Sequence, residues 1–178
     1  RIAEALIPVI NEHPRIIDWF DAEMPARIRM DLVETVGSWH LLAGFNWQDQ
    51  PADLHINAAD YHLEAGNYYY REFWSGQLGE SDGKDPILFR SVPAHGCVLL
   101  ALRRKVAEKA TYLGSDLHVS QGLEINAWEA SPHALHFSLR RPGRVRGKIW
   151  VSLPRNWEKK IAKNRICHLT SSLVHFAR

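Results

Sequence analysis

The chain has 178 residues, 46% hydrophobic and 24% charged, with a formal net charge of +2. These values are ordinary for a soluble globular protein and exclude disordered and collagen-like classes. No apolar run approaches the roughly 20 residues that span a bilayer, and Ile2–Ile10 is too short and too interrupted for a signal peptide. Because the chain begins with Arg1 rather than Met, we expect a fragment of a longer polypeptide.

The charge is unevenly distributed along the chain. Residues 1–103 carry 8 Lys and Arg against 15 Asp and Glu, a net of −7, whereas residues 104–178 carry 14 against 5, a net of +9. A basic tail that binds nucleic acid is one interpretation of such asymmetry. We favour the other, two modules of opposite charge, because the first half is acidic, and we expect no nucleic-acid partner.

Residues 1–24 are predicted to form a short helical lead-in, the end of an upstream barrel. Ile2, Leu6, Val9 and Ile10 recur at helical spacing before two prolines interrupt the pattern. From Arg27 the period changes to two, as in half-buried strands. Residues 25–103 are therefore predicted to be a β-sandwich, with strands separated by turns at Gly37-Ser38 and Gln48–Pro51, a turn-rich connection over 58–66 and a flexible loop over 76–86.

Arg104–Lys109 is predicted to be a charged hinge between two domains. Beyond it, residues 110–178 are predicted to form a second β unit with strands at 117–119, 123–129, 134–140, 147–153 and 165–174. The fold class expected for the whole chain is all-β, with antiparallel sandwich units of Greek-key or jelly-roll type after the helical segment. The cysteines, Cys97 and Cys167, are too few for a disulfide framework; buried free thiols are favoured over a single bridge.

Three segments of the first half carry a family resemblance: Gly44–Asp49 (GFNWQD), Tyr70–Gly76 (YREFWSG) and Val92–Leu102 (VPAHGCVLLAL). In this order they resemble the C-terminal β-sandwich of α-galactosidase (melibiase)-like glycoside hydrolases, with Glu72 where the family has an aspartate. Residues 112–122 are similar to a segment that follows the sandwich in larger members. The resemblance covers residues 25–125.

The resemblance implies an accessory domain rather than a catalytic one. The enzymes of this group are retaining glycosidases whose two catalytic aspartates lie on a (β/α)₈ barrel of about 250 residues. This sequence has neither that length nor that pattern, so we expect no catalytic residue in it. The predicted role is a non-catalytic C-terminal domain that packs on the upstream barrel of the same polypeptide and stabilises it. The sequence does not decide whether the protein forms homo-oligomers, whether it is cytoplasmic or secreted, or which substrate the parent enzyme hydrolyses.

The alternative is an independent carbohydrate-binding module, because sugar rings stack on aromatic side chains. Trp128 and Trp150 are the candidate sugar-binding residues, since each is predicted to lie on the strand face opposite an aliphatic stripe, Leu123/Ile125 for the first and Ile149/Val151 for the second. Packing of a second sheet on that face explains them equally well.

Other chemistry finds little support in the sequence. Ten histidines include no His-x-His pair, so no metal site is predicted, and no motif indicates a cofactor or membrane partner. His95 is predicted to bond a turn carbonyl and His118 to be structural. The basic cluster from Arg140 to Lys148 is interpreted as a solvated or interdomain turn.

Overall fold

The computed structural model describes residues 10–21, 23–106, 108–131, 134–140, 146–154 and 173–176. These residues form an all-β structure of antiparallel pairs and one parallel pair. The strands are β1 (Arg15–Ile16), β2 (Arg27–Glu34), β3 (Gly37–Phe45), β4 (Ala52–Ile56), β5 (Tyr68–Glu72), β6 (Leu78–Ser81), β7 (Ile87–Val92), β8 (Cys97–Arg104), β9 (Thr111–Ser115), β10 (Ile125–Ala130), β11 (Leu135–Leu139), β12 (Lys148–Ser152) and β13 (Leu173–Phe176), with a 3₁₀ turn η1 (Ala58–Tyr61).

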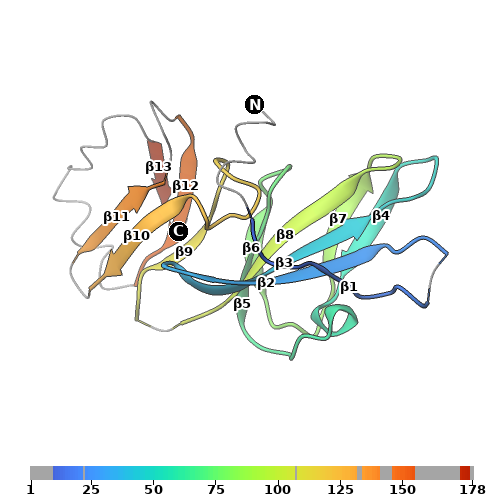
Figure 1. Cartoon of the computed structure of the whole chain (residues 1–178), viewed down its shortest axis with the longest axis horizontal. Coiled ribbons are helices and arrows are strands. Elements are labelled where there is room, and N and C mark those ends of the chain that lie inside the picture. Colours follow the sequence, from blue (N-terminus) through green and yellow to red (C-terminus); the bar gives the residue numbers. More distant parts are fainter. Residues whose placement is uncertain are drawn as a thin grey trace. The chain divides into compact units, whose positions relative to one another are not determined.

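The chain divides into two compact units. The first, called the sandwich unit, comprises residues 11–32 and 38–104; the second, called the C-terminal unit, includes 33–37 and the described residues from Lys105 onward. Figure 1 colours both along the chain. Each unit has its own cluster of buried apolar side chains.

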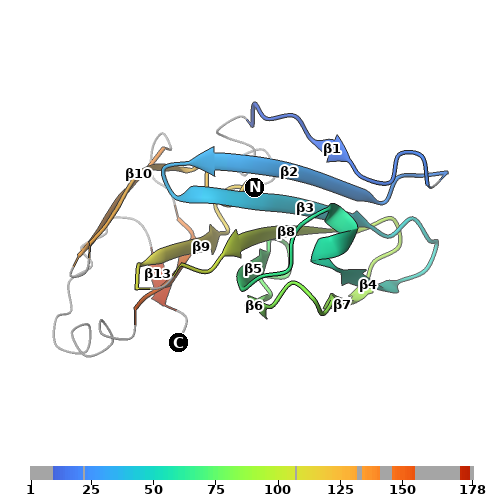
Figure 2. The same cartoon turned by 90° about the horizontal axis from the view of Figure 1, so that it is seen from below.

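The sandwich unit has two layers, visible in Figures 1 and 2. A six-stranded sheet has the order β1-β2-β3-β8-β5-β6, and β4 pairs with β7 in a two-stranded sheet. Alternate residues of the large sheet meet the small sheet in one core, because side chains of a strand alternate between faces. That core contains Leu42, Ile56, Tyr61, Tyr68, Ile87, Phe89, Val92, Val98, Leu100 and Leu102.

The opposite face of the large sheet, called the outer face, also holds buried side chains over part of its area. Trp39 is 1% exposed and Arg103 is 3% exposed, with the guanidinium carbon of Arg103 4.3 Å from the centre of the Trp39 ring. Leu41, Arg71 and Ala101 are buried nearby on β3, β5 and β8. A cation above a Trp ring is a favourable way to bury a guanidinium group.

The C-terminal unit is built from a hairpin and a mixed sheet. β10 pairs antiparallel with β11; β12 pairs antiparallel with β9 and parallel with β13. Its core contains Ala110, Tyr112, Leu117, Ile125, Ile149 and Val151. The predicted strand at 117–119 is wrong: this segment is a buried loop, and the strand lies earlier, at Thr111–Ser115.

The predicted helical lead-in is wrong for its described part. Residues 10–21 and 23–24 contain the short strand β1 and turns, and the described residues hold no helix beyond η1. The carboxylate of Asp18 accepts hydrogen bonds from the backbone of Ala26 and Arg27, both at 3.0 Å, and Ile17 N donates to Arg27 O. These bonds hold the segment as the partner of β2. Residues 1–9 of the prediction lie outside the described residues.

Candidate functional site

Asn46 joins the first and third family-like segments. Its side chain, 2% exposed, donates from Nδ2 to the carbonyls of Gln50, Val92 and Pro93, each at 3.0 Å, and accepts from Gln48 N at 3.1 Å. Both ends of the amide are therefore used to fix two turns at the end of β3 and β7. A buried polar group satisfied in this way specifies loop geometry.

Glu72 joins the second segment to the third. It is 2% exposed, and one carboxylate oxygen accepts from Leu99 N at 3.0 Å while the other accepts from Ser75 N and from Ser75 Oγ at 2.7 Å. Both oxygens bind the donors of a turn and of β8. The acid of the motif therefore joins the turn after β5 to β8.

His95 and Trp47, in the third and first segments, also make polar contacts. His95, in a left-handed conformation with φ 53°, places Nε2 3.0 Å from the Asp49 carboxylate, so its partner is a side chain and not the predicted turn carbonyl. Trp47 donates from Nε1 to Pro25 O at 2.9 Å and stacks on Phe45 with ring centres 5.2 Å apart.

Cys97 is a free, half-buried thiol in the same region. Burial raises the pKa of the Cys97 thiol, a hydrogen bond with Trp74 opposes the rise, and the charge of Glu72 adds to it. A reactive cysteine needs a lowered pKa, because the thiolate is the nucleophile. Cys97 therefore lacks the environment of a catalytic cysteine. Cys167 lies outside the described residues.

The outer face is open at the end that carries these segments. By strand alternation and register, this end bears Ala43, Phe45, Phe73, Cys97 and Leu99, all half-buried. Two exposed tryptophans border them, Trp47 at 40% and Trp74 at 52%. On the other side Ile16, which is 40% exposed, pairs with Ile28. We call these nine residues the open apolar face.

The segment between β1 and β2 extends the exposed apolar surface. Trp19 is 58% exposed, Phe20 95% and Met24 54%. Asp18, 4% exposed, fixes the base of this segment through its two backbone hydrogen bonds. Large apolar side chains held at the surface are a common feature of interaction surfaces.

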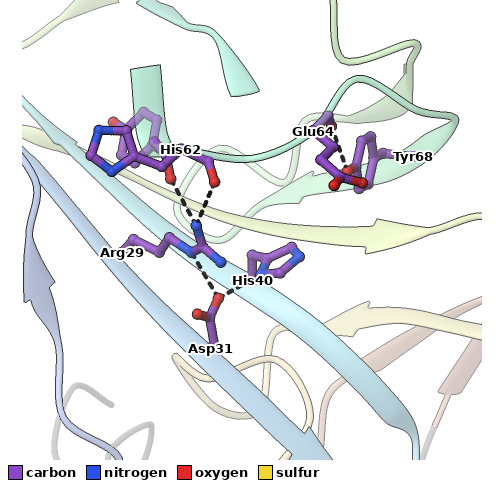
Figure 3. A network of polar contacts seen from close by, with 7 residues as sticks. Arg29, Asp31, His40, His62, Glu64 and Tyr68 are labelled. Atoms are coloured by element: carbon purple, nitrogen blue, oxygen red, sulfur yellow. Dashed lines mark hydrogen bonds and ion pairs between the residues drawn. The ribbon is translucent and has the colours of Figure 1, made fainter. Parts of the chain in front are cut away.

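A polar network lies on β2 and β3, as Figure 3 shows. Arg29 donates to the Tyr61 and His62 carbonyls, both at 2.9 Å, and to the Asp31 carboxylate at 2.8 Å, which also contacts His40 Nδ1 at 2.6 Å. Arg29 thereby caps the end of η1, where carbonyls lack partners. The arrangement ties the connection between β4 and β5 to the large sheet; sequence reasoning missed it.

Asp31 makes this network sensitive to acid. Burial acts to raise the pKa of the Asp31 carboxyl, but Arg29 and His40 outweigh it and hold the pKa below its ordinary value. A depressed pKa contributes stability that is complete above the unfolded-state pKa of about 3.9 and is lost as pH falls through the folded-state value. The Asp31 side chain is 35% exposed, so screening keeps the contribution to about 0.5 kcal/mol.

We therefore expect Asp31→Asn to lower the free energy of unfolding by about 0.5 kcal/mol at pH 7 and by less below about pH 4, because the Asp31 carboxyl of the unfolded wild-type chain is protonated there before that of the folded chain. Urea unfolding of both proteins at several pH values measures the difference. A difference that stays constant from neutral to acidic pH would contradict this assignment.

The two predicted sugar-binding tryptophans lie in different sheets of the C-terminal unit. Trp128, on β10, packs against that unit's core, edge-on to Tyr112 with ring centres 5.6 Å apart and beside Phe137. A bulge between Ile125 and Ala127 reverses the alternation and turns Trp128 to the same side as Ile125, so the expectation of opposite faces is wrong for this residue. Trp150, half-buried on β12, alternates with the core residues Ile149 and Val151.

The segment that resembles larger family members comprises most of β9 and the buried polar loop that follows it. Glu124, fully buried, accepts from Tyr112 Oη, Ser115 Oγ and, at 2.7 Å, Gly122 N. His118, also fully buried, places Nδ1 2.6 Å from Ser120 Oγ, in agreement with a structural role. These groups hold the connection from β9 to β10 and are closed to solvent.

Among the residues that the structure describes, no group of three or more His, Cys, Asp or Glu side chains is placed to hold a metal ion. In the same residues no helix is long and apolar enough to cross a membrane.

Comparison with known proteins gives limited similarity. No family model matches the chain, and no curated protein matches it. A solved structure that aligns with it is a family 27 β-L-arabinopyranosidase from Geobacillus stearothermophilus in complex with arabinose, at 17% identity and a TM-score of 0.37. The alignment covers 45% of this chain and 17% of that chain, so the chain corresponds to a small part of the enzyme's length.

Proposed function

We propose that the chain is a non-catalytic C-terminal region of an α-galactosidase-like glycoside hydrolase and that the sandwich unit docks on the catalytic barrel of the same polypeptide. The open apolar face, with the exposed Trp19 and Phe20 beside it, carries this proposal. A surface of this kind is unfavourable in water and favours a permanent partner.

The motif residues support a role in architecture. Asn46 and Glu72, two buried polar residues of the family-like segments, use their side chains to join those segments to one another. A retaining glycosidase needs two carboxyl groups about 5 Å apart that face the sugar. Glu72 is committed to three donors, and Asp49, 92% exposed, is bonded to His95. We propose a catalytic barrel as the partner because the three segments resemble the sandwich of α-galactosidase-like enzymes.

Docking predicts that substitutions on the surface act differently in two contexts. In the isolated chain, Trp19→Ser and Phe20→Ser are expected to change the free energy of unfolding by less than about 0.5 kcal/mol, because both side chains are exposed. In the polypeptide that includes the catalytic barrel, each should weaken the assembly by about 1–3 kcal/mol, the value of burying a large apolar side chain. Thermal unfolding and limited proteolysis measure both.

Val33→Ser is the matched control, since Val33 is 77% exposed on another part of the chain and should change neither protein. Equal effects of Phe20→Ser in the two contexts would exclude docking at this surface. Hydrolysis of p-nitrophenyl α-galactoside by the 178 residues alone would exclude the non-catalytic role.

A further inference from the structure

A depression in the sandwich unit is lined by residues that neither the family-like segments nor the open apolar face explains. It has a volume of about 440 Å³ and lies where β5, β6 and the start of β7 meet, with Tyr70, Gln77, Glu80, Asp82, Asp85 and Leu88 among its lining residues. Small-ligand sites usually have volumes of about 300–1,000 Å³, with an apolar floor and a few polar groups.

Tyr70 provides an ordered aromatic surface in this depression. It pairs with Gly79 across β5 and β6, and a methyl group on Gly79 would lie 2.6 Å from the Tyr70 hydroxyl oxygen and 2.7 Å from the adjoining ring carbon. The ring therefore lies directly over the glycine. Its edge contact with Phe89, at 6.5 Å and 79°, fixes it from the core side. A glycine inside a strand marks close approach of another group, here the tyrosine ring.

Polar groups surround this ring and are held by local bonds. Gln77 Nε2 lies 3.5 Å from the Tyr70 hydroxyl and 3.4 Å from Leu88 O. Asp82 accepts from Lys84 N at 2.9 Å and Asp85 N at 3.2 Å, and these backbone bonds hold the pKa of the Asp82 carboxyl below its ordinary value. The rim therefore offers carboxylate and amide groups in a fixed loop, which accept from and donate to hydroxyl groups.

We propose that this depression binds a pyranose unit of a saccharide, whose C–H face packs on Tyr70 and whose hydroxyls bond to Gln77 and to the carboxylates of Asp82 and Asp85. The aromatic floor favours a ring with an apolar face, and acceptors on the rim favour a ligand rich in hydroxyl donors. The inference does not rest on the proposed docking function, because it involves other residues of the sandwich unit.

Titration of the ¹⁵N-labelled chain with methyl galactoside, methyl glucoside and methyl xyloside tests the site. At least one pyranoside is expected to shift the amide signals of residues 77–88 with a dissociation constant in the millimolar range, and Tyr70→Leu should weaken this binding about tenfold or more. Tyr69→Leu, on the opposite face of the same strand, is the matched control and should leave affinity unchanged.

Gln77→Ala keeps the proposal testable if Tyr70→Leu does not fold, because Gln77 lies on the rim and should weaken binding about threefold or more. The absence of shifts with all three pyranosides would overturn the proposal. Amide shifts confined to residues outside the depression, or an equal loss of sugar affinity in Tyr69→Leu and Tyr70→Leu, would also overturn it. So would binding of Ca²⁺ or methylamine at residues 77–88 without any response to sugar. None of these outcomes would decide whether the sandwich unit docks on a barrel, which the Trp19 and Phe20 variants test.

Discussion

Asn46→Ala is expected to lower the free energy of unfolding of the sandwich unit by about 3 kcal/mol. The substitution removes a donor shared by the Gln50, Val92 and Pro93 carbonyls and the acceptor of Gln48 N. Each buried polar group that loses its partner costs about 1–3 kcal/mol, and water entering the vacated space recovers part of this. Urea unfolding followed by tryptophan fluorescence measures the loss.

A second variant separates the hydrogen bonds of Asn46 from its side-chain volume, and a variant at Asn57 is the control. Asn46→Asp keeps the shape but places a carboxylate oxygen where a donor faces three carbonyls, so it should be at least as destabilising as alanine at neutral pH. Asn57→Ala removes a single exposed bond, from Ala59 N at 3.2 Å, and should cost at most about 1 kcal/mol. A near-wild-type Asn46→Asp protein would show that the side chain only fills space.

The sandwich strands could be predicted from alternation, but the sequence misled at two places in this unit. β6, Leu78–Ser81, lies within the predicted loop at 76–86, because its glycine and polar residues give no strand pattern. It forms because Tyr70 covers Gly79 and the register joins β6 to β5. The helical lead-in predicted for residues 1–24 also fails over its described part, because the bonds to Asp18 are tertiary and have no periodic signature.

The candidate sites were less predictable than the strands. Trp128 was assigned to the wrong face because a single bulge residue reverses every later side chain of β10, and no pattern in the sequence marks the bulge. The network of Arg29, Asp31 and His40 joins residues up to 33 positions apart, counting the bond to His62. By contrast, the family-like segments indicated where Asn46 and Glu72 lie, although their bonding partners became visible only in the structure.

Glu72→Ala is expected to destabilise the sandwich unit by about 3 kcal/mol, because Ser75 N, Ser75 Oγ and Leu99 N lose the acceptor that the buried Glu72 carboxylate provides. Glu72→Gln should cost about 1–3 kcal/mol. Its one carbonyl oxygen can serve either Leu99 N or Ser75 N, while its amide nitrogen faces the other donor. Urea unfolding of the three proteins places them in the order wild type, glutamine variant, alanine variant.

Glu64→Gln is the matched control, since Glu64 is 89% exposed and contacts Arg104 at 3.3 Å; it should change stability by no more than about 0.5 kcal/mol. If Glu72 instead served a reaction, Glu72→Gln would leave stability near wild type, as Glu64→Gln does. A loss of stability in the Glu72 variants but not in Glu64→Gln is expected if the buried Glu72 carboxylate holds the turn at Ser75 to strand β8. This is the architectural role that the docking proposal gives to the motif.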